Sequence, residues 1–381
     1  MMPRCERSEL SRGTGEMAAW AVLAALAAGC CATQPIDASA SGSGRVTGHV
    51  GVGVGPGNGP VIGDSAPLEF VALSIDEVAV RLWPEPGPGA YVPVDQGQSE
   101  ALAELVRRLL AEPPAATREL FELAARAGFT VQGWEVLGQR YLAAIEEAGR
   151  RGGGGAYVVR VGASTGTAGT AGTPGTPGTP VILQAPHAFH DLGTERIGLE
   201  LLFAGQLWPR ALFVNTVHRY LGVDGLRRRQ PASPADPCHS PQHLFAVATA
   251  AALDVLPRAE VVQLHGFGDD SEEHDDEPGA SHPEAIVSGG RAVTATPRSQ
   301  VVADRLRAAL GVEVALFPVD IARLGATTNV QGRAILARGG AEFVHIEMSR
   351  TLRDQLRRDP AARERFAAAL QPDPLTGIRS P

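Results

Sequence analysis

Residues 180–201, PVILQAPHAFHDLGTERIGLEL, combine a clear structural pattern with chemically useful side chains. The apolar run at residues 181–183 has the length and branching of a buried strand, and it stops at Pro186. A helix is expected to begin near Thr194. Between the strand and the helix lie three side chains that can bind a metal: His187, His190 and Asp191. This is where an open α/β sheet places its ligand site.

Two later apolar runs end in the same kind of side chain. Residues 261–264 lead into His265, and residues 343–346 lead into Glu347. The carboxyl ends of parallel strands meet at one edge of a sheet, so three such endings indicate one shared site. The alternative is that these groups are ordinary polar residues that pair with one another at strand ends.

Strand and helix patterns alternate from Pro180 onward. Strands are predicted at residues 181–185, 211–215, 260–265, 285–288, 312–317 and 342–348. Helices are predicted at residues 194–205, 242–256, 300–309, 350–358 and 361–370. This alternation predicts an α/β fold, with a mixed, largely parallel sheet and helices on both faces, over residues 151–371.

Residues 66–150 are predicted to form a mainly helical segment that covers or packs on the main domain. Two short strands are expected at residues 70–73 and 78–83. Helices are expected at residues 99–111, 116–127 and 132–148, where apolar residues recur at spacings of three and four.

The beginning of the chain predicts export. Residues 1–31 contain arginines before a short apolar run, which is typical of a signal peptide. The sequence around Cys30 resembles a bacterial lipobox, so we expect lipidation of Cys30 and a lipid-anchored or periplasmic protein. Residues 32–65 are rich in Gly and Ser and are expected to form a flexible tether.

Two further stretches interrupt the main domain. Residues 164–180 are a low-complexity insertion of Gly, Thr and Pro, and residues 268–283 form an acidic loop. Ser164 lies in a G-x-S-x-G pattern, but that pattern needs a helix after the serine, and the insertion follows instead. We therefore do not interpret Ser164 as a nucleophile.

Composition excludes several chemistries. The chain of 381 residues has a formal net charge of -8 and contains no lysine, which rules out a lysine Schiff base and a Walker A phosphate loop. Its main basic cluster is residues 227–229 and aromatic residues are few, so no nucleic-acid partner is expected. The cysteines match no zinc motif or disulfide framework, and Cys238 is interpreted as a structural or incidental thiol.

The strand-end residues can supply the ligands of a hydrolytic zinc site. Such sites commonly use three protein ligands, here His187, Asp191 and His265, and leave a position for water. His190 is an alternative to Asp191 as a ligand, or a group that hydrogen-bonds to a ligand. Glu347, on another strand, is then the expected general base.

These residues also carry a resemblance to a known superfamily. The segments APHAFHDLGT (185–194), QLHGF (263–267) and HIEMSR (345–350) resemble the zinc carboxypeptidase and N-formylglutamate amidohydrolase superfamily, including its poly-γ-glutamate hydrolase relatives. The resemblance covers residues 180–358 and implies a phosphorylase/hydrolase-like sheet with Zn²⁺. It departs from the carboxypeptidase spacing, because position 190 is His and the carboxylate follows at Asp191.

The resemblance also implies contacts to the substrate. Arg219 would bind a substrate carboxylate, with Asn215 assisting, although a surface arginine is an equally open interpretation. Asp236, His239 and Asn329 lie in predicted loops, where each can line a pocket or serve as a turn or cap residue.

Taken together, the sequence predicts an exported zinc-dependent hydrolase of C–N amide bonds in a peptide, a γ-glutamyl chain or an N-acyl amino acid. One alternative is a non-catalytic envelope lipoprotein of the same fold that binds a metal or a peptide. Others are a serine or cysteine hydrolase using Ser164 or Cys238, and a structural lipoprotein.

Overall fold

The computed structural model describes residues 68–83, 87, 89–111, 118–147, 151–162, 179–204, 207–229, 233–268 and 283–372. All of them belong to one compact unit of the chain. The predicted signal peptide, Cys30, the tether, Ser164 and most of the low-complexity insertion and the acidic loop lie outside these residues.

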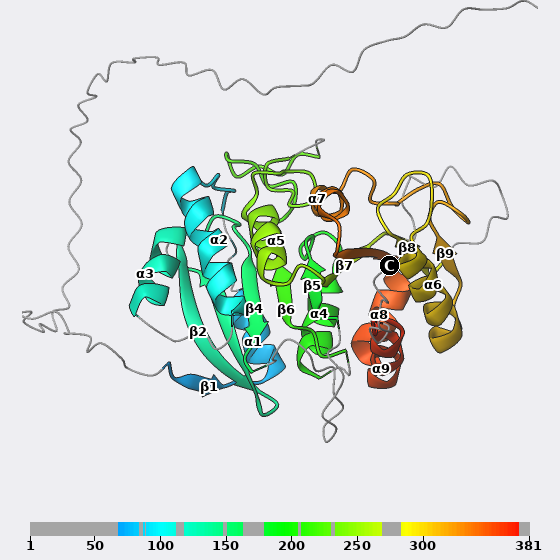
Figure 1. Ribbon diagram of the computed structural model, residues 1–381, viewed down its shortest axis with the longest axis horizontal. Helices are drawn as coiled ribbons and strands as arrows, with labels where there is room; N and C mark the ends of the chain where they lie inside the picture. Colours follow the sequence, from blue (N-terminus) through cyan, green and yellow to red (C-terminus); the bar gives the residue numbers. More distant parts are fainter. Residues whose placement is uncertain are drawn as a thin grey trace, which may run out of the picture. The chain divides into compact units, whose positions relative to one another are not determined.

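The described strands form a single mixed sheet (Figure 1). In sheet order they are β1 (Phe70–Ala72), β2 (Phe129–Val136), β3 (Gln139–Glu146), β4 (Ala156–Arg160), β6 (Ala211–Val214), β5 (Val181–Ala185), β7 (Glu260–Gly266), β10 (Glu342–Met348), β8 (Ala285–Ser288) and β9 (Val314–Leu316). The central strands β6, β5, β7 and β10 run parallel to one another. This confirms the predicted α/β fold with a mixed, mostly parallel sheet.

Helices cover both faces of the sheet, as predicted. One face packs against α2 (Gln96–Leu110), α3 (Arg118–Ala127), α5 (Leu244–Val255) and α7 (Val330–Arg338) (Figure 1). The other packs against α1 (Ile75–Leu82), α4 (Thr194–Phe203), α6 (Pro297–Leu310), α8 (Arg350–Arg358) and α9 (Pro360–Ala369). Among the helices described, none is both long and apolar enough to cross a membrane.

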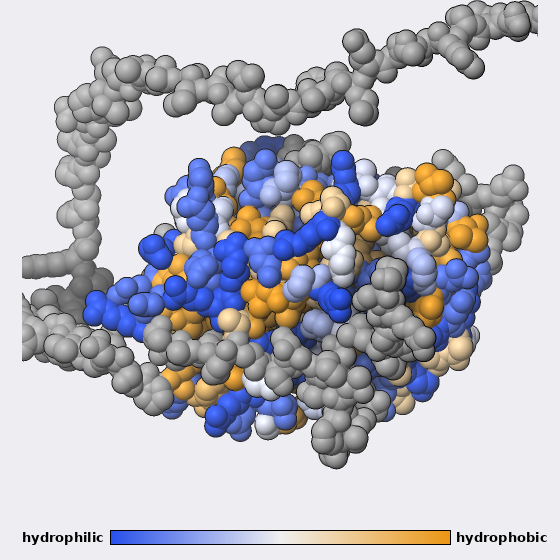
Figure 2. Space-filling model, in the orientation of Figure 1, coloured by the Kyte–Doolittle hydropathy of each residue, from blue (hydrophilic) through white to orange (hydrophobic). Residues whose placement is uncertain are grey.

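Apolar burial on both sides of the sheet holds these layers together. Leu183 and Val262 pack toward one helical layer, while Ile182 and Val261 pack toward the other. Successive strand residues point to opposite faces, so a central strand covered on both sides is apolar throughout. On the outer surface, Figure 2 shows hydrophilic residues interspersed with smaller hydrophobic areas.

The segment at residues 66–150 differs from its prediction in two places. The helix expected at residues 132–148 is wrong, because residues 132–146 belong to the hairpin of β2 and β3. Residues 141–144 of β3 are all buried, so the strand lacks the alternation of polar and apolar residues that would have distinguished it from a helix. The strand expected at residues 78–83 is also wrong, because α1 occupies most of that stretch.

A capping box explains why α1 forms there. The Ser74 side chain accepts a hydrogen bond from the backbone N–H of Glu77, and the Glu77 carboxylate accepts one from the N–H of Ser74. This reciprocal pair starts a helix. The strands β1, β2 and β3 then extend the same sheet that contains the predicted site.

The β2–β3 hairpin generates a test of the corrected topology. Leu137 and Gly138 form its two-residue loop with φ of 50° and 74°, a conformation that favours glycine. A Cβ added to Gly138 would meet no atom within 4 Å, so its substitution changes only backbone strain. We expect Gly138→Ala to lower the free energy of unfolding by about 1 kcal/mol.

The measurement is chemical denaturation, with Gly89→Ala as the matched control. A Cβ at Gly89 also meets nothing within 4 Å, and its φ lies outside the left-handed region. Equal stability of the two variants would contradict the hairpin.

Candidate metal centre

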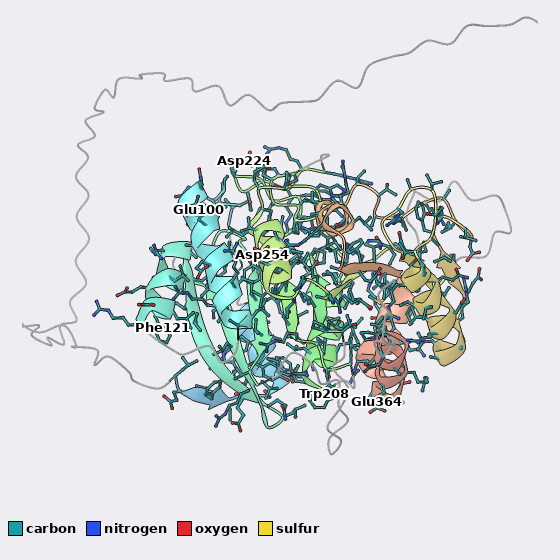
Figure 3. All side chains as sticks on the ribbon, viewed as in Figure 1. Glu100, Phe121, Trp208, Asp224, Asp254 and Glu364 are labelled. Carbon is teal, nitrogen blue, oxygen red and sulfur yellow. The ribbon has the colours of Figure 1, made fainter. Side chains whose placement is uncertain are left out.

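The predicted site residues come together at the carboxyl ends of the central parallel strands. His187 follows β5, His265 lies in β7, and His345 and Glu347 lie in β10. The register of β7 and β10 places Glu347 directly opposite His265. The loop after β6, which includes the labelled Asp224 in Figure 3, lies at this edge of the sheet.

A cavity of about 650 Å³ opens onto these side chains. Its lining includes every predicted metal ligand, the alternative ligand His190, and Glu347, Arg219 and Asn329. Cys238, His239 and His345 also line it. The site is therefore a buried cluster of titratable groups at the base of a cavity large enough for a small substrate.

Asp191 lies between the two imidazoles of the predicted ligand set. Its Oδ2 atom is 3.3 Å from Nδ1 of His187 and 3.2 Å from Nδ1 of His265. Ligand atoms bound tetrahedrally to one zinc ion are about 3.3 Å apart, because zinc bonds to His and Asp are about 2.0–2.2 Å long. All three side chains are at most 4% exposed. The donor types of these three side chains are ones that zinc binds, and two of the three spacings match a tetrahedral site.

His187 lies between two carboxylates. Its Nε2 atom is 3.0 Å from Oδ1 of Asp236, and its Nδ1 atom is 3.3 Å from Oδ2 of Asp191 and 3.2 Å from Nη1 of Arg219. Burial disfavours a charged His187, but Cys238, Asp191 and Asp236 hold its pKa well above the ordinary value. In a bound state, the Asp236 carboxylate would accept the Nε2 proton and leave Nδ1 as the nitrogen that can bind an ion.

The pKa shifts in the cluster show that its buried anions attract a positive charge. The imidazoles of His187 and His265 outweigh the effect of burial and hold the pKa of Asp191 well below its usual range. Burial disfavours a charged His265, but Cys238 and Asp191 raise the pKa of His265 to about 9. The buried anions thus attract a positive charge, which a proton or a metal ion can supply.

The groups of donors whose ligand atoms all lie within 4.8 Å of one another do not include Asp191. In the described part of the chain they are His187, Cys238 and His265, and His265, His345 and Glu347. Burial and the neighbouring His265 hold the pKa of His345 well below its ordinary value. Its buried Nδ1 atom has no hydrogen-bond partner in the described part of the chain. His345 is therefore a neutral imidazole with a free nitrogen beside the cluster.

Cys238 has a different environment from the one its sequence suggested. It is 2% exposed, and its Sγ lies 3.9 Å from Nε2 of His265. Burial raises the pKa of a thiol, but His187 and His265 outweigh it and lower the pKa of Cys238 to about 6. The interpretation of Cys238 as a structural or incidental thiol is therefore wrong, because Cys238 is part of the buried cluster.

Glu347 lies where a general base is expected. It is 8% exposed, it lines the cavity, and its Oε1 is 3.5 Å from Nε2 of His345. Burial raises its pKa to about 7. A carboxylate of this pKa can take up and release a proton near neutral pH.

Arg219 is close to the cluster but is already paired. Its Nε donates to Oδ2 of Asp236 over 2.9 Å, and the same oxygen lies 3.1 Å from Nδ1 of His239. Asp236 therefore connects Arg219, His187 and His239. The predicted contact of Arg219 with a substrate carboxylate would require this guanidinium to be shared between Asp236 and the substrate.

The structure separates the remaining candidates. His190 lies at the cavity wall, with its ring 5.5 Å from that of His218 and 5.3 Å from that of Tyr220. Asn215 is fully buried, and its side chain bonds only to nearby backbone in the bonds described, at Val217 and Thr216. It is absent from the described lining of the cavity.

Sequence reasoning gave little or no role to several groups in the cluster, namely Cys238, His345, Asp236 and Gln263. His345 and Gln263 each lie two positions before a predicted site residue on the same strand, and alternation places them on the same face. The two-residue period of a strand could therefore have predicted the positions of His345 and Gln263 from the sequence. Asp236 and Cys238 lie in a loop, and a loop has no regular period from which the direction of a side chain can be predicted.

Solved structures similar to this chain match it at low identity and low TM-score. One is an N-formylglutamate amidohydrolase from Ralstonia eutropha JMP134, at 15% identity and a TM-score of 0.32, with 51% of this chain and 92% of that chain covered. Another is a candidate metallopeptidase from Shewanella amazonensis SB2B, at 13% identity and a TM-score of 0.27, with 66% and 89% covered. A candidate metallopeptidase from Shewanella baltica OS155 has 11% identity and a TM-score of 0.29, with 74% and 96% covered.

These are the classes that the resemblance of residues 180–358 also names. No protein-family model matches the chain, and no curated protein matches it. Because the TM-scores are low, function is argued below from the site residues alone.

The contact between Asp236 and His187 generates a second test. Asp236→Asn keeps the size of the side chain but lets an amide N–H face Nε2 of His187, which favours the opposite tautomer. We expect zinc affinity to fall about 10–100-fold in this variant. Competition with a zinc-binding dye measures the affinity.

The matched control is Asp224→Asn, which removes an exposed carboxylate that pairs with Arg228. It should leave zinc affinity unchanged. Equal affinities in the two variants would show that Asp236 does not orient a ligand.

Proposed function

We propose that this chain is a zinc-dependent hydrolase that cleaves a C–N amide bond. The observation that carries the proposal is the position of Asp191 Oδ2, 3.3 Å and 3.2 Å from the Nδ1 atoms of His187 and His265, beside the buried carboxylate of Glu347. Two imidazoles and one carboxylate are a donor set typical of catalytic zinc sites. Substrate classes consistent with the cavity are peptides, γ-glutamyl chains and N-acyl amino acids.

Each side chain has a role in this proposal. His187, Asp191 and His265 hold the ion. Bound zinc would polarise a substrate carbonyl and acidify a water molecule. Glu347 accepts a proton from the attacking water and delivers it to the amine that leaves. Arg219, next to the cluster, binds a carboxylate of the substrate while Asp236 keeps it in place.

A cysteine hydrolase is the second candidate, because Cys238 combines a lowered pKa with a neighbouring imidazole. Its Sγ atom lies 3.9 Å from Nε2 of His265, and the residue lines the cavity. A thiolate next to a histidine is an activated nucleophile. This candidate predicts turnover that survives a chelator and is lost in Cys238→Ala.

The test of the zinc proposal combines metal content with turnover of amide substrates. We expect about one zinc per chain, with loss of the ion in His187→Ala and His265→Ala. Glu347→Gln should keep the zinc and lower kcat about 10²- to 10⁴-fold, because it loses only the base.

Two results would overturn the proposal. One is the absence of zinc after reconstitution of the folded protein. The other is full activity in Glu347→Gln with bound zinc, which would leave a binding protein or a different catalyst. Glu364→Gln, an exposed change on α9, is the matched control for loss of a glutamate.

We further propose that the protein is exported to a bacterial cell envelope and anchored there by a lipid on Cys30. The support is the apolar run and lipobox-like sequence of residues 1–31. Cys30→Ala should move the protein from the membrane fraction to the soluble fraction. An unchanged distribution would contradict the anchor.

A further inference from the structure

One buried arginine on α8 binds the backbone of three segments that are far apart in the sequence. Nε of Arg353 donates to the carbonyl of Leu192 over 3.0 Å, and its Nη1 donates to the carbonyl of Phe267 over 3.1 Å. The same Nη1 also donates to the carbonyl of Met348. A single guanidinium thus joins the turn after β5 to the ends of β7 and β10.

Each of these carbonyls lies close in the chain to a side chain of the proposed site. Residue 192 directly follows Asp191, residue 267 comes two positions after His265, and residue 348 directly follows Glu347. Two of the proposed ligands and the proposed base are therefore tied through short pieces of backbone to one side chain, Arg353.

The guanidinium lies on the face of the sheet opposite to the site. Met348 is paired with Gly266 in the register of β10 and β7, and successive strand residues point to opposite faces. A Cβ added to Gly266 would lie 2.9 Å from Nε of Arg353 and closer still to its Cζ and Nη1. The guanidinium therefore fills the space that a side chain at position 266 would occupy.

The start of α8 fixes the place of this arginine. Ser349 follows β10 directly, and its hydroxyl oxygen accepts the N–H of Leu352 over 3.0 Å, which caps the helix. The backbone N–H of Ser349 donates to the carbonyl of Glu284 over 2.8 Å. No loop separates the strand that carries Glu347 from the helix that carries Arg353, so their relative position is fixed.

The contacts suit an arginine in particular. Arg353 is 7% exposed, and a buried carbonyl without a donor is costly. A guanidinium presents five N–H donors in one rigid plane, whereas a lysine ammonium is a compact charge on a flexible stem. A lysine at this position would keep the charge but could not hold three separate carbonyls in one plane.

We propose that Arg353 is a positioning residue that holds Asp191, His265 and Glu347 in place by binding the backbone beside each of them. It lies behind the sheet and touches neither substrate nor ion. A metal or catalytic site needs such support, because a displacement of about 1 Å can lower a rate about 100-fold. The consequence for metal and catalysis rests on the proposed function, whereas the tie between the three segments does not.

The matched pair for the test is Arg353→Lys and Arg298→Lys. Arg298 is also buried, at 9% exposure, and it too binds several segments: its guanidinium contacts the carboxylate of Glu260 and the carbonyl of Leu370. Glu260 begins β7 at the end opposite to His265. The control therefore makes the same chemical change in a similar environment, away from the site.

Hydrogen exchange of backbone amides in the metal-free protein is the first measurement. The N–H of Thr194 donates to the carbonyl of Asp191, and the N–H of Phe267 to that of Met348. We expect both amides to exchange about 10- to 100-fold faster in Arg353→Lys, because each lost bond to a charged donor makes local opening easier. Arg298→Lys should leave them unchanged. Equal exchange in both variants would overturn the proposal.

The second measurement reports on the bound ion. Cobalt(II) in place of zinc gives an absorption spectrum that depends on the geometry of its ligands. We expect Arg353→Lys to change this spectrum and to weaken zinc binding about 10-fold or more, with neither effect in Arg298→Lys. A role in stability alone would leave the spectrum of the folded variant unchanged, and that result would contradict the proposal.

Gly266→Ala provides an independent variant, because its Cβ displaces the guanidinium and leaves Arg353 in the chain. Its effects on exchange and on zinc affinity should resemble those of Arg353→Lys, and the two changes together should not add. Full additivity would show that Gly266 acts without Arg353 and would count against the proposal.

Failure of the proposed function gives a different pattern. If the unmodified chain binds neither zinc nor cobalt, the metal site is refuted. Faster exchange at Thr194 and Phe267 in Arg353→Lys alone would still establish the tie between the three segments.

Discussion

The contact of the Asp191 carboxylate with two imidazoles is the interaction on which the site depends. Its Oδ2 atom lies 3.3 Å and 3.2 Å from the Nδ1 atoms of His187 and His265. Burial disfavours charge on both imidazoles, but the surrounding anions raise the pKa of His187 well above its ordinary value and that of His265 to about 9. Without a metal ion, protons therefore supply the positive charge between these groups. A zinc ion would displace the protons and bind donors that zinc prefers.

The parallel strands explain why these groups meet with the required accuracy. His265 and Glu347 are opposite one another in the register of β7 and β10, and His187 follows the adjacent strand β5. Sites built on strands of a packed sheet hold their geometry better than sites built on loops. The loops add the adjustable parts, since Asp236 and Arg219 come from the segment between β6 and α5.

Sequence patterns predicted the parts of this arrangement that follow a period. The endings of the strands identified His187, His265 and Glu347, and the alternation of strands and helices predicted the layered fold. The β2–β3 hairpin was missed because residues 141–146 of β3 are all buried, so that strand shows no alternation. The contacts of Arg219 with Asp236 and of Asn329 with Gln263 join separate segments, and local sequence carries no record of such contacts.

X-ray absorption at the zinc edge tests the central claim most directly, because it reports the atoms bound to the ion. The account predicts nitrogen and oxygen neighbours at about 2.0–2.2 Å, with the outer scattering of two imidazoles and no sulfur. A sulfur neighbour at about 2.3 Å would show that Cys238 binds the ion, and would contradict the assignment of His187, Asp191 and His265 as its ligands.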